Sequence, residues 1–320
     1  MKKILSVISL IFIGVSCSQI EHKHTTEEKK GAHNEVLGIT TSILPLASIT
    51  NYIGGEYVKT TSLIPAGVSP HGFDLTPNQM VTIQKSDLIV SLGYDHIDGF
   101  LEKAIDGKNT LIATQGVKMM KGSDDHNHEE HDENENHEDH DEHEEHSDVH
   151  EMDPHVWTSA ENALIIAQNI QNKLSELQPE HRLLFQKNYN NFETELTSLR
   201  EDFLGSTKGK TQPEFIVFHD AYNYLFEELA IDQKKKLVFR TNILSDPNST
   251  EMKEIIDEIT NHGVKNFYKE PQFNSDNLDN LADQYDLVVD ILNPIGSDDS
   301  KNGYIQNYRE NLTALKKIYE

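Results

Sequence analysis

Three histidines, His71, His155 and His219, stand in short motifs whose residue types could bind a metal ion, since a neutral imidazole is a common metal ligand. Each is flanked by Pro or Asp and lies where an apolar run ends or a helix is predicted to begin. In open α/β sheets, ligands bind at that edge. A single histidine in such a context is more often a structural residue than a ligand. A metal site therefore requires that the elements carrying these histidines bring them together.

Apolar runs and helical segments alternate along two stretches of the chain, which is typical of parallel sheets covered by helices. In the first stretch, strands are predicted at residues 36–42, 57–64, 87–92 and 110–113, with helices from Leu44, from Pro77 and near Ile97. The second stretch repeats the rhythm, with strands predicted at residues 215–218, 236–239, 264–268 and 287–292. The predicted fold class is therefore α/β, with two lobes that each hold a parallel sheet flanked by helices.

Two amphipathic helices are predicted between the lobes. The first begins at a capping box, Thr158-Ser159-Ala160-Glu161, and then repeats apolar residues at steps of three and four. The second runs from Pro179 to Gly205 with the same period. A helix of that length spans on the order of 40 Å, so we expect one long rigid helix to join the two lobes. An ordinary core helix of one domain is the alternative.

Residues 122–151 form an acidic, low-complexity segment with fifteen Asp and Glu, eight of the 17 histidines and no Lys or Arg. Such a segment cannot bury a core, so we predict a disordered loop. It either collects metal ions weakly through its imidazoles or is a solvated loop without a function. The net charge of −26 argues against binding to nucleic acid or to anionic lipid.

The N-terminus has the features of an exported protein. Two lysines precede a mostly apolar run at residues 4–15 that is too short for a spanning helix, so residues 1–16 are predicted to be a signal peptide. The only cysteine of the chain, Cys17, stands where the lipobox of bacterial lipoproteins would place it, and this resemblance implies acylation of Cys17. Residues 17–35 lack a hydrophobic period and are predicted to be a flexible tether.

The remaining chain is expected to divide into three parts. An N-terminal α/β lobe is predicted at residues 36–178 and contains the loop at 122–151. The linking helix is predicted at residues 179–205, and a C-terminal α/β lobe at residues 206–320.

Five short motifs follow one another along these parts, with the histidine-rich segment after the first and the long helix after the second. They are SPHGFDLTP at 69–77, DPHVW at 153–157, FHDAY at 218–222, KEPQF at 269–273 and DILNPIG at 290–296. Their order resembles the metal-binding solute-binding proteins of ABC transporters, specifically the zinc-specific ZnuA-like branch. The resemblance covers essentially all residues after the tether.

This resemblance implies that His71 and His155 of the first lobe and His219 of the second are ligands of a metal ion held in the cleft between the lobes. Three neutral imidazoles suit tetrahedral Zn²⁺, whereas oxygen-rich sites suit Mn²⁺ better. The manganese branch of the family usually has Glu at the position of His219, so the histidine found here favours zinc.

The fourth ligand position departs from the family pattern. Many relatives have Asp before a Pro where this chain has Asn293, and an amide oxygen is a weaker zinc ligand than a carboxylate. We predict three histidines with either Asn293 or a water molecule, and the nearby Asp290 is a further alternative. His96 is a candidate auxiliary ligand, and Asp220 is a candidate partner that orients the imidazole of His219.

An open ligand position would also suit a catalytic zinc ion, but the sequence holds no HExxH, GxSxG, P-loop or GxGxxG motif, so we predict a receptor and not an enzyme. The expected protein is a monomeric, high-affinity Zn²⁺ receptor in the periplasm or cell envelope, attached to the membrane only through a lipid on Cys17. Zinc would be its transported ligand, delivered to an ABC permease and its ATPase. A manganese or iron receptor of the same fold and a metal-buffering or adhesin lipoprotein are the alternatives.

Overall fold

The structure, a computed structural model, describes residues 36–122, 152–240, 248–273 and 276–320. The predictions for the signal peptide, for the tether and for all but Gly122 of the histidine-rich loop lie outside the described residues. No helix in the described part of the chain is long and apolar enough to cross a membrane.

A parallel sheet of four strands lies at the centre of the first lobe. The strands are β1 (Leu37–Thr41), β2 (Val58–Ser62), β3 (Leu88–Ser91) and β4 (Thr110–Ile112), in the order β2-β1-β3-β4. All their pairings are parallel. Every residue of β3 is buried, as expected for a central strand of a sheet covered on both faces. The four strands predicted from the hydrophobic pattern are confirmed.

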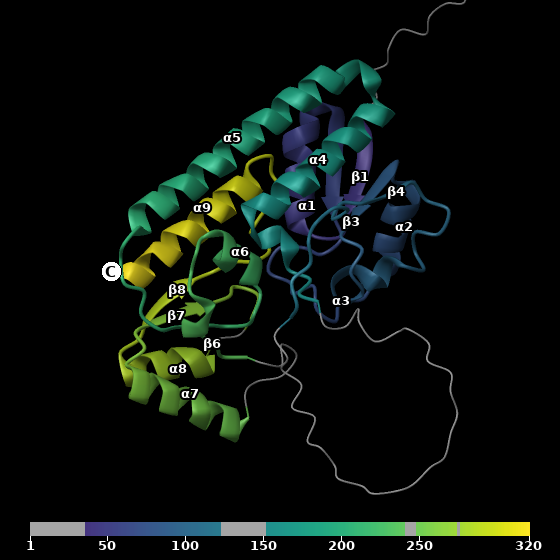
Figure 1. The fold of residues 1–320 in the computed structure, drawn as a ribbon. Helices are drawn as coiled ribbons and strands as arrows, with labels where there is room; N and C mark the ends of the chain where they lie inside the picture. The colour runs from purple at the N-terminus through teal and green to yellow at the C-terminus, as the bar shows by residue number, and fades with distance from the viewer. Residues whose placement is uncertain (1–35, 123–151, 241–247, 274–275) are drawn as a thin grey trace, which may run out of the picture. The chain divides into compact units, whose positions relative to one another are not determined.

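Three helices follow the first three strands of this sheet, and Figure 1 shows them around it. They are α1 (Leu44–Gly54), α2 (Pro77–Lys85) and the single turn α3 (Asp95–Asp98). Ten of the eleven residues of α1 are buried, so it packs as a core helix. The start of α2 is set by Thr76, whose hydroxyl accepts from the Gln79 backbone while the Gln79 side chain accepts from the Thr76 backbone.

The second lobe repeats this topology. Its strands are β5 (Phe215–Val217), β6 (Lys236–Val238), β7 (Asn266–Lys269) and β8 (Val288–Ile291), in the order β6-β5-β7-β8 with all pairings parallel. The helices are α6 (Asn223–Glu228), α7 (Ser249–His262), α8 (Asp276–Tyr285) and α9 (Gly303–Lys316). In each sheet the chain moves outward in both directions from its first strand, so the ends of β1 and β5 lie at topological switch points, where such folds bind ligands.

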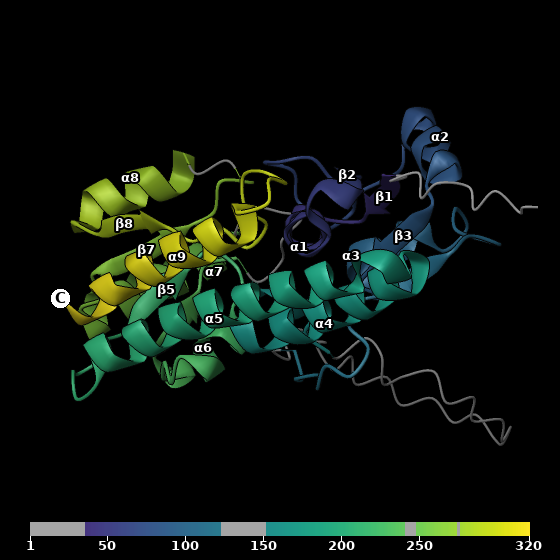
Figure 2. The same ribbon diagram turned by 90° about the horizontal axis from the view of Figure 1, so that it is seen from above.

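Two long helices connect the lobes in sequence. They are α4 (Ala160–Leu177) and α5 (Arg182–Thr207), separated by the 3₁₀ turn Pro179–His181. The 26 residues of α5 span about 39 Å, and the helix contacts α4 and α1 of the first lobe and α9 of the second. Figure 2 shows α5 running beside both α4 and α9.

The start of α4 differs from the predicted capping box. The N-cap residue is Ser159 and not Thr158, and its hydroxyl accepts a hydrogen bond from the Asn162 backbone. Thr158 belongs to the preceding 3₁₀ helix Val156–Thr158. Further 3₁₀ helices lie at Gly55–Tyr57, Gly99–Leu101, Gln233–Lys235 and Lys317–Tyr319.

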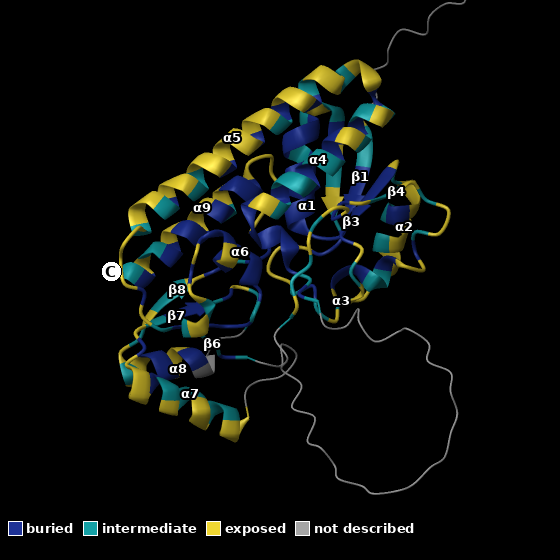
Figure 3. Ribbon diagram, in the orientation of Figure 1, coloured by how far each residue is buried: buried dark blue, intermediate teal, exposed yellow. Residues whose placement is uncertain are grey.

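One continuous apolar cluster extends through both lobes. It contains buried side chains from both sheets and from α5, among them Ile39, Val90, Phe192, Phe215 and Tyr268. The face of α5 that packs on the other helices is buried and its opposite face is exposed (Figure 3). Because apolar surface shared by two lobes would be exposed if they separated, the fold resists a wide opening between its lobes.

Candidate metal centre

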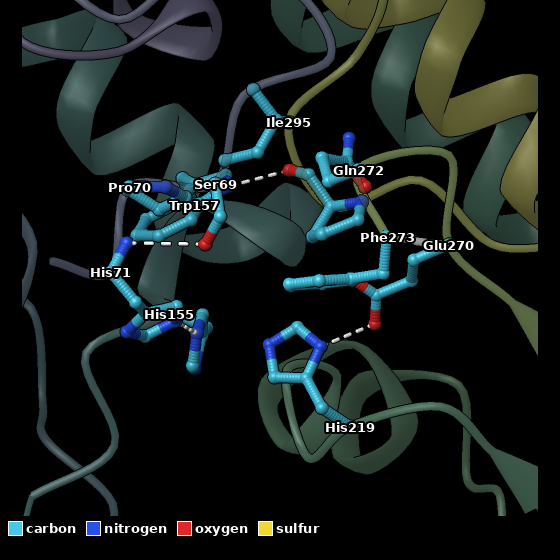
Figure 4. Close-up of a pocket in the computed structure, with 11 residues that line it drawn as sticks. Ser69, Pro70, His71, His155, Trp157, His219, Glu270, Gln272, Phe273 and Ile295 are labelled. Atoms are coloured by element: carbon cyan, nitrogen blue, oxygen red, sulfur yellow. Dashed lines mark hydrogen bonds and ion pairs between the residues drawn. The ribbon is translucent and has the colours of Figure 1, made fainter. Parts of the chain in front are cut away.

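His71 lies on the loop that follows the carboxyl end of β2. Its backbone N–H donates to the Ser69 hydroxyl at 3.2 Å, and the chain turns at Gly72, whose φ of 72° suits a glycine. This turn presents the imidazole of His71 toward His155 and His219, as Figure 4 shows.

His155 is held by a carboxylate two residues before it. Asp153 Oδ1 accepts from the backbone N–H of His155 at 2.9 Å and lies 2.8 Å from its Nδ1. Asp153 is 3% exposed and His155 is 6% exposed. A carboxylate on Nδ1 orients the ring and leaves Nε2 free to bind a metal ion.

His219 is held in the same way by Glu270. His219 follows β5 and Glu270 follows β7, which is a direct neighbour of β5 in the second sheet. Neighbouring parallel strands end at the same edge, so the side chains meet there, and Glu270 Oε1 accepts a very short hydrogen bond from His219 Nδ1. Only 2% of Glu270 is exposed. The sequence motif KEPQF contains this residue, but its role was not predicted.

The three imidazoles converge on a small cavity (Figure 4). The Nε2 atoms of His71 and His155 lie 3.1 Å apart, and candidate ligand atoms of all three rings lie within 4.8 Å of one another. Two ligands of a tetrahedral zinc ion would be about 3.3 Å apart. His219 Nε2 is buried without a hydrogen-bond partner, and the cavity encloses about 10 Å³, room for about one ion or water molecule.

His71 is held in its neutral form. Its pKa is lowered from 6.5 to about 2, first because burial disfavours the charged ring and then because three other histidines lie nearby. The neutral ring is the form that binds metal ions. This part of the site is therefore prepared to accept a cation without first releasing a proton at neutral pH.

Acid is expected to destabilise the metal-free protein through His71. Between pH 6.5 and about 2 the unfolded chain carries a proton on this ring and the folded chain does not, so stability is fully present above pH 6.5 and falls as the pH drops. Lowering the pH from 7.5 to 5 should cost about 1 to 2 kcal/mol more in the wild type than in His71→Gln. Urea unfolding at the two pH values checks this, and equal losses in both proteins would contradict it.

Side chains of the second lobe help to hold the first-lobe residue His155. Asp153 Oδ2 accepts from Asn223 Nδ2 at 3.1 Å, and the backbone oxygen of Asp153 accepts from the Tyr224 hydroxyl at 2.8 Å. Both partners lie at the start of α6. The Tyr224 hydroxyl also accepts from the backbone N–H of Met120 at 2.9 Å, so it contacts the chain on both sides of residues 123–151.

Trp157 and Glu228 add further bonds between the lobes. The indole N–H of Trp157 donates to the Pro294 carbonyl at 2.7 Å, on the loop after β8. Glu228 of α6 accepts from the Ala160 backbone at the start of α4 at 3.0 Å, and burial raises the pKa of its carboxyl group. These bonds place the loop that carries His155 directly against the second lobe.

The predicted fourth ligand, Asn293, has its side-chain oxygen engaged elsewhere. Asn293 Oδ1 accepts from Gln272 Nε2 at 2.7 Å and from the backbone N–H groups of Ile295 at 3.1 Å and Gly296 at 3.0 Å. Asp290, the other alternative, accepts from Lys317 Nζ at 2.5 Å. The cavity is lined by the three histidines and by Ser69, Pro70, Trp157, Glu270, Gln272, Phe273, Pro294 and Ile295.

Two further residues named from the sequence lie near the histidine cluster. Asp220 pairs with Lys236 of β6, while the carboxylate on His219 Nδ1 is that of Glu270. His96 is exposed at the start of α3, and its charge contributes to the lowered pKa of His71. It lies close enough to act on His71 electrostatically.

The two parallel sheets, the long helix that contacts both lobes and the buried histidine cluster where the lobes meet define a two-lobed solute-binding protein. Residues 39–318 match the family described as ZnuA, "Zinc-uptake complex component A periplasmic", and the chain belongs to this family. Members of the family are solute-binding receptors, which confirms the prediction that the chain is not an enzyme.

Named relatives span the chain to different extents. The high-affinity zinc uptake system protein ZnuA of Bacillus subtilis (strain 168) is 28% identical over 323 residues, covering 98% of this chain and 96% of the relative. The zinc-binding lipoprotein AdcA of Streptococcus pneumoniae (strain ATCC BAA-255 / R6) is 27% identical over 298 residues, which cover 88% of this chain. The match spans only 55% of that longer relative.

A solved structure described as the crystal structure of ZnuA has the same fold. Its TM-score is 0.74 at 22% identity, covering 89% of this chain and 100% of that one. The predicted fold class of two lobes, each with a parallel sheet flanked by helices, and a long helix between them is therefore confirmed.

Proposed function

We propose that this chain is an extracytoplasmic receptor that binds Zn²⁺ with high affinity between its lobes and delivers it to an ABC permease powered by an ATPase. The observation that carries the proposal is the convergence of His71, His155 and His219, with two Nε2 atoms 3.1 Å apart and a carboxylate on the Nδ1 of two of the rings. The names of the relatives, zinc uptake protein and zinc-binding lipoprotein, support it.

The ion is coordinated by three imidazoles and, in the fourth position, by water. Water is favoured over Asn293 because the amide oxygen of that residue already accepts three hydrogen bonds. Three nitrogen ligands suit Zn²⁺ better than Mn²⁺, which prefers oxygen. Asp153 and Glu270 supply two negative charges next to the ligands and so offset the charge of the ion.

The receptor is anchored through a lipid on Cys17 and acts as a monomer. The histidine-rich segment at residues 122–151 is accessory: it raises the local zinc concentration through many weak sites.

The decisive experiment measures zinc stoichiometry and affinity in three proteins. These are the mature chain, the same chain without residues 123–150, and a His71→Ala/His219→Ala double variant. The loop deletion is expected to keep the tight site and the double variant to lose it. If tight binding follows the loop and ignores the two histidines, the protein is a metal buffer on this fold. Retention of Mn²⁺ or iron against equimolar zinc would instead favour a receptor for that metal.

Zinc is expected to change the spacing of the lobes only slightly. The shared apolar core and the bonds between Trp157 and Pro294 and between Glu228 and α4 would all be broken by a wide opening. Small-angle scattering of the metal-free and zinc-loaded protein should give nearly equal radii of gyration. A change of several ångströms would show that the lobes move as separate bodies.

A further inference from the structure

A second group of metal-ligating side chains lies on the second lobe, outside the histidine cluster described above. Glu214 directly precedes β5, and Glu258 and His262 lie four residues apart on α7. His262 Nδ1 lies 2.9 Å from Glu214 Oε2, and His262 Nε2 lies 3.2 Å from Glu258 Oε2. One candidate ligand atom from each of the three residues lies within 4.8 Å of the others.

The backbone explains why these three side chains meet. Residues four apart on a helix share one face, which places Glu258 and His262 side by side. The helix ends at His262 because Gly263 adopts a left-handed conformation, with φ at 66°. Glu214 is brought to this point by β5, the inner strand that pairs with both β6 and β7.

The charges of this group are not balanced by its own members. A neutral imidazole carries one N–H, so it can donate to only one of the two carboxylates beside it. Glu214 Oε2 is shielded from solvent and has no hydrogen-bond partner, although it lies 2.9 Å from the ring. Even a protonated ring would offset only one of the two carboxylates, so the group keeps a net negative charge, which a divalent cation would neutralise while accepting a lone pair from a ring nitrogen.

We propose that Glu214, Glu258 and His262 bind a second divalent transition-metal cation, independently of the cleft. One imidazole nitrogen and carboxylate oxygens are a donor set that zinc accepts, with water completing the coordination. The side chains are 33%, 45% and 47% exposed, so the site is open to solvent and binds more weakly than the buried cleft. The zinc-loaded receptor therefore holds two ions outside the histidine-rich loop, one tight and one weak.

The test uses the full mature chain with the eight histidines of residues 126–150 replaced by Gln, so that the loop does not obscure a weak site. Zinc is added and binding is followed by isothermal titration calorimetry. Two events are expected. The weaker event should be lost in His262→Gln and in Glu258→Gln, with a fall in zinc affinity of more than about 100-fold. Loss of a residue that only orients a ligand already lowers metal affinity about 10- to 100-fold, and loss of a ligand itself should cost more.

Two further variants make the result specific. Glu254→Gln, one turn earlier on α7 and in the same groove as Glu258, should keep both events. Glu258→His places two imidazoles four residues apart and should strengthen the weak event. A single binding event, or a weak event that persists unchanged in His262→Gln, overturns the proposal. Neither outcome bears on the cleft, whose tight event depends on His71 and His219.

Discussion

Replacing His155 with Ala is expected to weaken zinc binding by more than about 100-fold, since losing a residue that only orients a ligand already costs about 10- to 100-fold. A 100-fold loss corresponds to about 2.7 kcal/mol. His155 is 6% exposed, and its Nε2 lies 3.1 Å from that of His71, so alanine leaves a gap that water fills in place of a ligand. Competition with a chromophoric chelator, on the chain without residues 123–150, gives the dissociation constant.

His181→Ala is the matched control for this variant. His181 is also largely buried, but it stacks on Tyr57 with ring centroids 3.6 Å apart and does not line the cavity. Its replacement should lower the stability and leave the zinc affinity near the wild-type value. A folded His155→Ala protein that binds zinc as tightly as the wild type would remove His155 from the site.

Glu270→Gln is expected to weaken zinc binding by about 10- to 100-fold while leaving the metal-free protein at least as stable as the wild type. The two effects have opposite signs because Glu270 is almost fully buried and its Oε2 makes no hydrogen bond of good geometry, which is costly for a carboxylate. The nearby Tyr222 has a raised pKa because of burial and of Glu270. When zinc binds His219, the negative charge becomes favourable. Melting temperatures with and without zinc separate the two effects.

Glu228→Gln is a control that is expected to have the reverse effects on stability and on zinc affinity. Glu228 is also buried, but its two oxygens accept from the backbone of Ala160 at 3.0 Å and of Glu161 at 3.1 Å. Gln has only one acceptor oxygen, so one of these two backbone N–H groups would lose its partner, and the substitution should lower the stability and spare the zinc affinity. If Glu270→Gln behaved like this control, Glu270 would be a structural residue and not an orienting partner of His219.

The strands were predictable because burial on both faces of a parallel sheet demands continuous apolar runs, as in β3 and β5. The start of α4 was less predictable. Thr158 and Glu161 form a capping-box pattern, but the cap is Ser159, and Glu228 accepts from the first two N–H groups of the helix. Because Glu228 lies 68 residues from Ala160, the sequence around the helix start cannot show that it accepts these hydrogen bonds.

In the candidate site, too, some residues were predictable from the local sequence and others were not. His71, His155 and His219 stood out because each follows or precedes a regular element beside Pro or Asp, and the structure brings all three together. Glu270 stood in a motif without an assigned role, because nothing in the sequence says that β5 and β7 are neighbours. The assignment of Asn293 as a ligand stays a prediction, and the hydrogen bonds to its oxygen make water the stronger candidate.

The sequence by itself determined the α/β class and the two lobes, since hydrophobic periodicity is a local property of the chain. Its short motifs also singled out His71, His155 and His219 as candidate metal ligands. Only the tertiary structure decided which carboxylates orient the rings, how α6 holds Asp153 and how Glu214 reaches α7. These contacts depend on the order of strands in each sheet and on the packing of one lobe against the other. Strand order and packing arise from the burial of apolar surface between segments far apart in sequence, which no local pattern encodes.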